Sequence, residues 1–269
     1  MTQGDWGLGA TGKPDQLALD FGTAATTKDT ARGAGLSGSR SAPGLPGQLS
    51  LWDVDTWKPA VLVPQPAKPR TADALARLKE EALACQKCGL REGCKGVVFG
   101  EGDPAAGLLL VGEGPGQVED ETGRPFVGAA GNLLDRILEA VGLRREEVYI
   151  ANVVKCRPPQ NRVPMPEERA ACRPWLDRQI ELIDPDVIIC LGASAAQVLL
   201  GEDLRITQAR GRWFEYTLTP TTGTGEGEER VRHIKVMPTF HPAAILRDPS
   251  KRRPVWEDFK LVKAALARA

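Results

Sequence analysis

The sequence predicts an α/β protein: a three-layer α/β/α sandwich with a central, mainly parallel four-stranded sheet, preceded by a disordered N-terminal arm. Three observations support this fold class. Four short apolar runs rich in β-branched residues alternate with helical stretches, the runs are continuously apolar, and 42% of the 269 residues are apolar. Continuously apolar strands are buried on both faces, as in a parallel sheet that helices cover on both sides. This apolar share is enough to form a core.

Residues 1–70 have the composition of a flexible arm. The first 50 residues hold 10 of the 29 glycines and no cysteine, and a Pro-rich connector runs from Pro59 to Pro69. Segments of this kind bury too little surface to offset the entropy that is lost on ordering. We therefore divide the chain into an arm, residues 1–70, and one folded domain, residues 71–269.

The folded domain is expected to begin with a helix at Thr71, because leucines recur there at helical spacing. The expected strands are Leu108–Val111, Val148–Val154, Val187–Leu191 and Ile234–Phe240. The helices expected between and after them are Ala130–Val141, Pro166–Ile183, Ala193–Leu200 and Pro254–Ala267. Residues 213–218 and 231–236 are expected to pair as a hairpin around a connection rich in Gly, Thr and Glu.

The 35 basic and 35 acidic residues give no net charge, which excludes a strongly basic nucleic-acid coat protein and an acidic tail protein. A local basic face stays open. No stretch approaches the ~18 apolar residues of a membrane span, and the N-terminus shows no signal-peptide pattern. We expect a monomeric cytoplasmic protein without a membrane partner. In that reducing compartment, cysteines serve as metal ligands or core residues before they form disulfides.

Four of the six cysteines have the spacing of a metal or cluster site. Cys85 and Cys88 form a Cys-x-x-Cys pair at the end of the first helix, Cys156 follows the second strand, and Cys172 lies sixteen residues further on. Four thiolates from such separate segments hold a zinc ion or an iron–sulfur cluster, and spacing alone does not choose between them. The alternative is that Cys156 and Cys172 are ordinary core residues.

In parallel α/β sheets, ligands bind at the carboxyl ends of the strands. Here Gly112-Glu113-Gly114-Pro115-Gly116 follows the first strand, Asn152 closes the second, and His241 follows the last. The glycine-rich segment is neither a P-loop nor a dinucleotide-binding fingerprint. Phe126, between Pro and Gly segments, is either a flat platform for a ligand or a loop residue that fills the core. A lone histidine is more often structural, but this position opposite Glu113 and Asn152 favours a catalytic role.

Taken together, these motifs resemble the iron–sulfur family 4 uracil-DNA glycosylases over about residues 75–267. The matching segments are Cys85-x-x-Cys88, Gly112–Gly116 with Glu119-Asp120, Gly123–Phe126, Asn152 with Lys155–Arg162, Cys172 and His241-Pro242. The resemblance implies a base-excision-repair enzyme that flips uracil out of DNA and hydrolyses its N-glycosidic bond, leaving an abasic site. Its substrate would be uracil-containing DNA, single- or double-stranded, at the nucleoid.

The resemblance also implies roles for individual residues. It implies a 4Fe–4S cluster, and so favours the cluster over zinc, on Cys85, Cys88, Cys156 and Cys172. It implies a uracil pocket in which Phe126 stacks on the base, Asn152 reads its edge and His241 lies near O2. The remaining residues of that pocket are Gly112, Glu113 and Gly114.

Glu113 is the expected water-activating residue, with Asp120 as a reserve candidate. In the best-known uracil glycosylases an aspartate occupies the position of Gly114, where this chain has no side chain to activate water. His241 is expected to stabilise the departing uracil. The alternative function is a non-catalytic or product-trapping iron–sulfur DNA-binding protein of the same fold. Product-trapping relatives carry a histidine-bearing loop after the Asn-bearing strand, and residues 155–162 contain no histidine.

An apolar tip followed by basic residues comes after His241. A wedge that fills the gap left by a flipped base, flanked by phosphate contacts, fits this pattern, and a solvated loop is the alternative. We expect DNA contacts from Leu246, Arg247, Lys251 and Arg252, with Arg157 and Arg162 extending the basic face.

The arm carries two similar short motifs, which resemble the bacterial sliding-clamp-binding motif. In that motif a Gln, a Leu and a terminal aromatic residue or Leu occupy a preformed pocket. A flexible tether of this kind raises the effective concentration of the enzyme without a new enzyme–DNA contact. The expected clamp-binding residues are Gln16, Leu17, Leu19 and Phe21 in the first motif, and Gln48, Leu49, Leu51 and Trp52 in the second.

Overall fold

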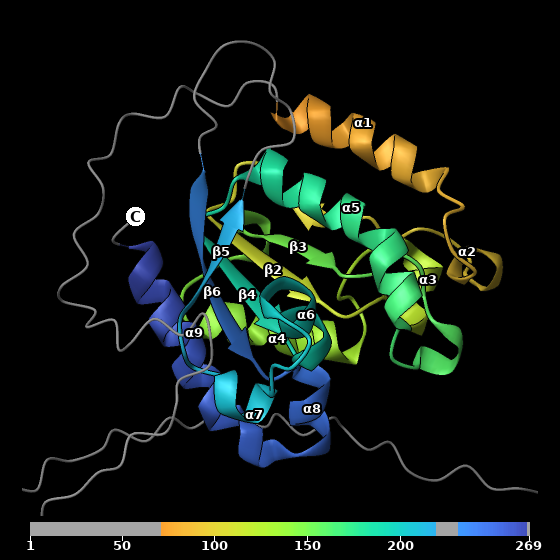
Figure 1. Cartoon of the computed structure of the whole chain (residues 1–269). Coiled ribbons are helices and arrows are strands. Elements are labelled where there is room, and N and C mark those ends of the chain that lie inside the picture. Colours follow the sequence, from red (N-terminus) through yellow and green to blue (C-terminus); the bar gives the residue numbers. More distant parts are fainter. Residues whose placement is uncertain (1–70, 219–230, 268–269) are drawn as a thin grey trace, which may run out of the picture. The chain divides into compact units, whose positions relative to one another are not determined.

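The computed structural model describes residues 71–218 and 231–267, and within them one six-stranded sheet has the order β1-β3-β2-β4-β6-β5 (Figure 1). The four central strands run parallel, and the two edge strands pair antiparallel with their neighbours. This confirms the expected parallel four-stranded sheet and adds one strand at each edge. The N-terminal arm, both clamp-like motifs and the hairpin connection lie outside the described residues.

The strands are β1 (Glu101–Gly102), β2 (Leu108–Gly112), β3 (Tyr149–Asn152), β4 (Val187–Leu191), β5 (Phe214–Leu218) and β6 (Arg232–Thr239). Strand β1 escaped prediction because two residues carry no periodicity. The expected hairpin is confirmed by the pairing of β5 with β6, in which Tyr216 lies opposite Ile234. After β3 ends, the N–H groups of Val153 and Val154 still donate to the carbonyl oxygens of Gly112 and Glu113, at 2.9 and 3.1 Å.

The helices are α1 (Thr71–Leu83), α2 (Leu90–Gly93), α3 (Gln117–Thr122), α4 (Ala129–Ala140), α5 (Pro166–Ile183), α6 (Ala193–Leu200), α7 (Ile206–Ala209), α8 (Pro242–Arg247) and α9 (Arg252–Leu266). The 3₁₀ turns are η1 (Arg145–Glu147), η2 (Pro159–Asn161) and η3 (Pro249–Lys251). The five long helices match the expected ones to within two residues. The four short helices α2, α3, α7 and α8 were not predicted, because six residues or fewer span too few turns to show a helical period.

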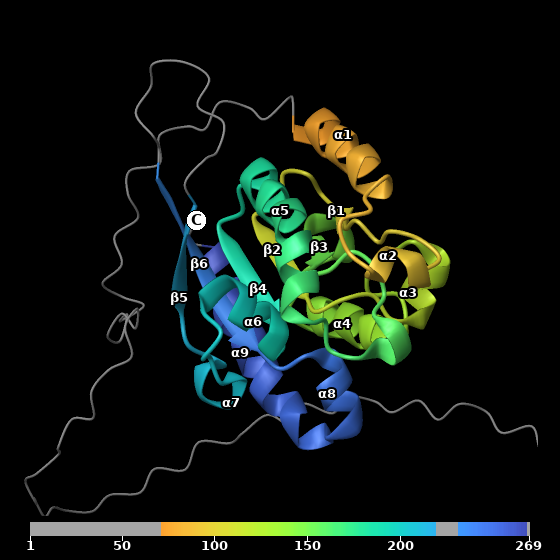
Figure 2. The ribbon, with the colours of Figure 1, turned by 45° about the vertical axis from the view of Figure 1, so that its right-hand side comes forward.

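Helices cover both faces of the sheet, and each face has its own apolar core. Leu109 and Val111 of β2 belong to the core formed with α1, α5 and α6, whereas Leu108 and Leu110 belong to the core formed with α4, α8 and α9. Figure 2 shows these two sets of helices on opposite sides of the strands. Cys190 of β4 is fully buried in the first core, which confirms the interpretation of its apolar run. The three-layer prediction is thus confirmed in its packing.

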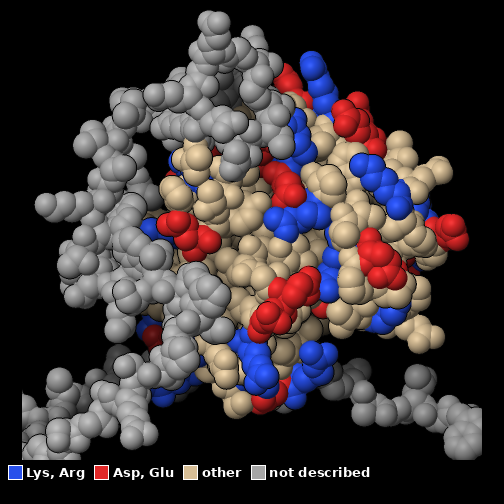
Figure 3. Space-filling view, in the orientation of Figure 1, with Lys and Arg blue, Asp and Glu red and all other residues tan. Residues whose placement is uncertain are grey.

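Acidic and basic side chains are interspersed over the surface seen in Figure 3, without a large field of one sign. This distribution agrees with a net charge of zero. None of the described helices is both long enough and apolar enough to cross a bilayer. Contacts to an anionic partner therefore depend on individual cations at chosen positions.

Candidate active site and cysteine cavity

The polar residues expected at the strand ends meet at one edge of the sheet. Gly112 pairs with Asn152 in the β2–β3 register. A Cβ atom at Gly112 would lie 2.4 Å from Oδ1 of Asn152 and 2.5 Å from Cζ of Phe126. The amide of Asn152 and the ring of Phe126 therefore approach each other across a bare backbone, and any side chain at position 112 would displace one of them.

Asn152 presents a buried hydrogen-bond acceptor that the protein leaves unused. The residue is 1% exposed, and its Oδ1 atom has no hydrogen-bond partner among the described residues. A buried acceptor without a partner costs about 1–3 kcal/mol of stability, so native proteins keep few of them. Such an atom at the carboxyl end of a central strand is available to accept a hydrogen bond from a ligand.

His241 is a neutral imidazole whose free nitrogen carries the proton. The ring lies near Phe126, with 5.5 Å between ring centroids. Its Nδ1 accepts the N–H of Ala243 at 3.1 Å, which caps helix α8 and places the proton of the neutral ring on Nε2. Burial, assisted by the charge of Arg247 and opposed by Glu119, lowers the pKa of His241 to about 4. At neutral pH the ring is thus a hydrogen-bond donor without charge.

Glu113 is a carboxyl group whose pKa is raised by burial. The hydroxyl of Ser194 and the charges of Arg169 and Arg247 act in the opposite direction. Ser194 lies in the first turn of α6 and is 6% exposed, and its hydroxyl lies close enough to the Glu113 carboxyl to lower the pKa of that group. Sequence reasoning missed Ser194, although its position just after β4 at the same sheet edge was a usable signal.

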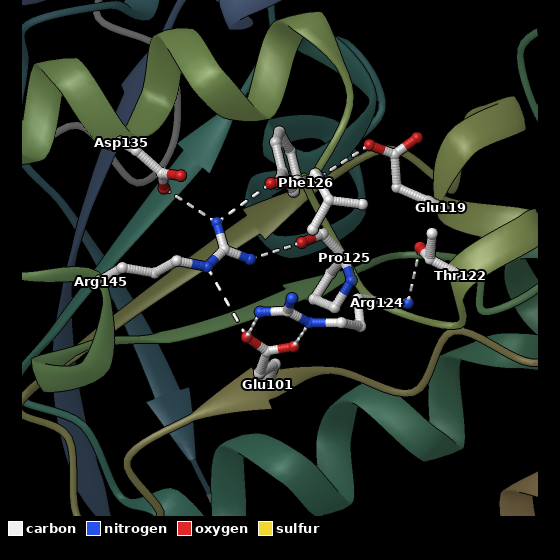
Figure 4. A network of polar contacts seen from close by, with 9 residues as sticks. Glu101, Glu119, Thr122, Arg124, Pro125, Phe126, Asp135 and Arg145 are labelled. Atoms are coloured by element: carbon white, nitrogen blue, oxygen red, sulfur yellow. Dashed lines mark hydrogen bonds and ion pairs between the residues drawn. The ribbon is translucent and has the colours of Figure 1, made fainter.

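Phe126 lies on a loop that is held from two sides (Figure 4). The backbone of Phe126 has a φ of 50°, which is uncommon for an aromatic residue. Arg145 donates to the carbonyl oxygens of Phe126 at 3.0 Å and Pro125 at 2.6 Å, and to Oδ1 of Asp135 at 2.9 Å. A Cβ at Gly131 would lie 1.9 Å from the Phe126 carbonyl oxygen, so only glycine lets α4 approach the loop this closely.

Glu119 holds the other side of the same loop. Its Oε1 accepts the N–H groups of Val127 at 2.9 Å and Gly128 at 2.8 Å. These two amides stand at the N-terminal end of α4, where a carboxylate is favourable. Sequence reasoning assigned no role to Arg145 and none to Glu119 itself. Both act on backbone atoms of a loop, and such contacts leave no pattern in the sequence.

Asp120 and Gly114 are the two other positions considered for a water-activating acid. Asp120, the reserve candidate, is 5% exposed, and its Oδ1 accepts the N–H of Lys95 at 2.9 Å in the loop after α2. This contact gives Asp120 a structural role, and its catalytic role stays a prediction. At Gly114, a Cβ would lie 2.8 Å from Cγ2 of Val154, so any side chain at this position would have to displace Val154.

The four cysteines of the predicted cluster line one small cavity on the α1–α5 side of the molecule. All six cysteines of the chain are free thiols. Burial raises the pKa of Cys172, and burial together with the neighbouring Cys94 thiol raises the pKa of Cys156. Among the described residues, no three His, Cys, Asp or Glu side chains are arranged around a single metal ion. The donor set around the cavity is nevertheless thiols alone, which suits a soft metal or an iron–sulfur group.

Lys155 connects the cysteine cavity to the candidate active site. It is 2% exposed, and its Nζ donates to the backbone oxygen of Asn152 at 2.8 Å and to Oε1 of Gln179 at 2.5 Å. Its backbone N–H donates to Sγ of Cys172 at 3.3 Å. Burial lowers the pKa of Lys155 to about 8. The segment that carries Asn152 is therefore fixed to the segment that carries a cysteine ligand candidate.

Some of the residues expected to contact DNA are exposed, whereas others are already bonded to neighbouring side chains. Leu246 is 52% exposed, as a wedge requires, and Arg247 and Arg252 are exposed. Lys251 forms an ion pair with Asp248. Arg157 donates to Asn161 at 2.8 Å, and Arg162 forms two hydrogen bonds, at 2.6 and 2.8 Å, with the buried carboxylate of Glu168.

Comparison with known proteins shows the family of this chain. A family described as "Uracil DNA glycosylase superfamily" matches residues 99–260. A type-4 uracil-DNA glycosylase of Sulfurisphaera tokodaii is 43% identical over 196 residues, which are 71% of this chain and 84% of the relative. Type-4 uracil-DNA glycosylases of Thermotoga maritima and Archaeoglobus fulgidus are 45% and 42% identical over 194 residues, with 94% and 92% of their lengths covered by 71% of this chain.

The matched region contains every strand, the Phe126 loop and His241. The relatives are covered over most of their lengths, and so the similarity extends well beyond one shared motif. The chain therefore belongs to the uracil DNA glycosylase superfamily and, within it, to the type-4 uracil-DNA glycosylases.

Proposed function

We propose that this DNA-repair glycosylase reads an extruded uracil with Asn152, stacks it on Phe126, and hydrolyses its N-glycosidic bond with His241 and Glu113. Members of its family act on uracil in DNA. The observation that carries the assignment is the buried, unpartnered Oδ1 of Asn152. The base must leave the duplex first, because the glycosidic bond is out of reach inside the stack.

Asn152 discriminates uracil from cytosine through the polarity of one amide. Oδ1 accepts the N3–H of uracil, and the amide NH₂ donates to O4. Cytosine carries an acceptor at N3 and a donor at its exocyclic nitrogen, so it would place an acceptor against an acceptor. Because Asn152 is only 1% exposed, the mismatch leaves buried polar groups unpaired, and the wrong base is rejected.

The chemical step breaks the bond between C1′ of the sugar and N1 of uracil. The electron pair of that bond goes to the uracil ring, and Nε2–H of neutral His241 donates to O2, where the negative charge develops. Glu113 accepts a proton from water as the water oxygen bonds to C1′. Glu113 then releases its proton to solvent and the uracil anion takes a proton at N1, so the products are free uracil and an abasic site.

A cleavage assay tests the proposal. Purified protein is incubated with a uracil-containing single-stranded oligonucleotide, which is then heated in alkali to break the strand at abasic sites. We expect cleavage at the uracil, and an intact strand would refute the enzyme assignment. A DNA–protein adduct that survives denaturing electrophoresis would instead support the product-trapping alternative.

We also propose that Cys85, Cys88, Cys156 and Cys172 hold a 4Fe–4S cluster. Support comes from their common cavity, from a donor set of thiols alone, and from the type-4 family of the relatives. A bound cluster would cross-link α1, the segment after β3 and α5, and its iron would ionise the thiols. A Cys172→Ser variant should lose iron, sulfide and visible absorption, whereas Cys94→Ser, a neighbouring thiol outside the set, should retain all three. Equal iron content in both variants would refute the assignment.

We further propose that the two motifs in the arm tether the enzyme to a bacterial sliding clamp. The support is their shared Gln-Leu-x-Leu pattern, in residues 16–21 and 48–52. A chain deleted through Pro69 should lose binding to the clamp and keep its cleavage of short oligonucleotides. Unchanged clamp affinity would overturn the proposal.

A further inference from the structure

A groove of about 330 Å³ runs between helix α4 on one side and α8, η3 and the start of α9 on the other. Figures 1 and 2 both show α8 beside α4, and the two helices pack against each other. Side chains of α4, α8 and the start of α9 line the groove: Asn132, Leu133, Arg136, Ile245, Leu246 and Arg252. The lining thus combines apolar side chains with two arginines.

The two arginines of the groove come from different helices, Arg136 from α4 and Arg252 from α9. Both are exposed, and neither forms an ion pair with any residue in the described ranges. No acidic residue lines the groove. Most other arginines discussed above are already paired, as Arg145 is with Asp135 and Arg162 with Glu168. A lining that combines two unpaired guanidinium groups with apolar side chains favours an anionic ligand with an apolar part.

Both walls of the groove begin at the candidate uracil site. Helix α4 starts two residues after Val127 of the Phe126 loop, and α8 starts directly after His241. A base that is stacked on Phe126 and bound at its O2 by His241 is attached to a strand that must leave the site along the surface. The groove lies at the start of that surface.

We propose that this groove binds the nucleotide next to the flipped uracil on the same strand, with its phosphates on Arg136 and Arg252 and its sugar or base against Leu133 and Leu246. The proposal rests on the proposed function and extends it, because it assigns a subsite outside the uracil pocket and brings Asn132 and Arg136 of α4 into DNA binding. A nucleotide suits the groove because it combines a negative charge with an apolar ring face.

Substrate truncation combined with mutation tests the groove. Three single-stranded oligonucleotides are compared, in which uracil has four neighbours on both sides, only on its 5′ side, or only on its 3′ side. We expect Arg136→Ala to lower kcat/KM about fivefold on the substrates that fill the groove and to leave the third unchanged, since one charge-assisted phosphate contact is lost. Arg253→Ala, which removes an exposed charge next to Arg252 but outside the groove lining, is the matched control.

The affinity of the same variants is measured for oligonucleotides that carry an uncleavable abasic analogue. This measurement tests DNA binding in the groove independently of catalysis. For Arg136→Ala, the slope of log K against log salt should fall by about 0.7, the value for one single-strand phosphate. An equal effect of Arg136→Ala on all three substrates, or an effect no larger than that of Arg253→Ala, would overturn the proposal that the groove binds a nucleotide. Failure of the unmodified chain to cleave any substrate would instead refute the proposed function.

Discussion

The Phe126 loop and the strand ends beside it differ in how their polar groups are hydrogen-bonded. In the loop, the polar groups are paired: Arg145 donates to two backbone carbonyl oxygens and to Asp135, and Glu119 accepts from two backbone N–H groups. At the strand ends, Oδ1 of Asn152 is buried without a partner among the described residues. Figure 4 shows how densely the loop is bonded.

The difference separates positioning from recognition. A loop that carries an aromatic platform at φ 50° keeps its geometry only if surrounding contacts fix it, and satisfied hydrogen bonds do so. A group that reads a base must instead retain an unused donor or acceptor, at a cost in stability. Mutations in the two regions should therefore have opposite signatures, with losses of stability in the loop and losses of activity at the strand ends.

The largest effect is expected for Asn152→Ala. The variant loses two buried hydrogen bonds to uracil, at about 2 kcal/mol each, and kcat/KM should fall about 10³-fold. Thermal stability should be unchanged or higher, because the unpartnered Oδ1 is removed. Single-turnover cleavage and thermal unfolding measure the two effects.

Thr239→Val is the matched control for a buried polar group that is satisfied. Thr239 is fully buried and donates to Asp258 at 2.6 Å, so its removal should cost about 1–3 kcal/mol of stability while cleavage is retained. If Asn152→Ala destabilised the fold as much as Thr239→Val, Oδ1 would not be an acceptor held for a ligand.

The next effect is expected for Glu113→Gln, which should lower the cleavage rate about 100-fold, since an amide cannot accept a proton from water. Glu113 must be ionised to act as a base, and burial raises its pKa. The rate of the unmodified enzyme should therefore be lost as pH falls through a value above the ordinary one for glutamate. His241, with a pKa of about 4, is already neutral in that pH range, so its titration does not cause this loss of rate.

Ser194→Ala tests the same carboxyl without removing it. The Ser194 hydroxyl lowers the pKa of Glu113, so its loss should move the acidic limb of the rate profile to higher pH and leave the plateau rate nearly unchanged. A limb that stays in place would show that Ser194 does not act on Glu113, or that another group titrates.

A smaller effect on activity is expected for Arg145→Met. The variant loses its hydrogen bonds to the Phe126 loop and leaves Asp135 without its ion-pair partner, which should cost about 2–3 kcal/mol of stability. A less well fixed platform should raise the inhibition constant of free uracil about tenfold. Arg124→Met is the control, because Arg124 binds Glu101 beside the loop but not the Phe126 carbonyl. Equal changes in the two variants would contradict a positioning role for Arg145.

The sequence was sufficient for the parts of the molecule that follow a repeating pattern. Continuous apolar runs predicted the four parallel strands, and their carboxyl ends predicted that Glu113, Asn152 and His241 would lie at one edge. The contacts of Arg145 and Glu119 were out of reach, since they bind main-chain atoms, which every residue has. The contact of Asp120 was equally out of reach, because adjacent positions on a short helix point in different directions, Glu119 to the Phe126 loop and Asp120 to Lys95.

The smallest effect on DNA binding is expected for Arg162→Ala. Arg162 was expected to contact phosphate, but its guanidinium is bonded to Glu168, whereas Arg252 is exposed and unpaired among the described residues. Arg162→Ala should change the affinity for single-stranded DNA less than twofold, against about fivefold for Arg252→Ala.

The cost of Arg162→Ala should appear in stability and depend on pH. Pairing with Arg162 lowers the pKa of Glu168, against the opposing effect of burial. A carboxyl whose pKa is lower in the folded state stabilises the fold above its unfolded pKa, and that contribution is lost as pH falls through the folded value. The stability difference between the unmodified chain and Arg162→Ala should therefore be largest near neutral pH and shrink below the ordinary pKa of glutamate, which thermal unfolding at several pH values would measure. A stability difference that persists at acidic pH would contradict the role of the Arg162–Glu168 pair. A DNA affinity that falls as far as in Arg252→Ala would show that Arg162 contacts DNA.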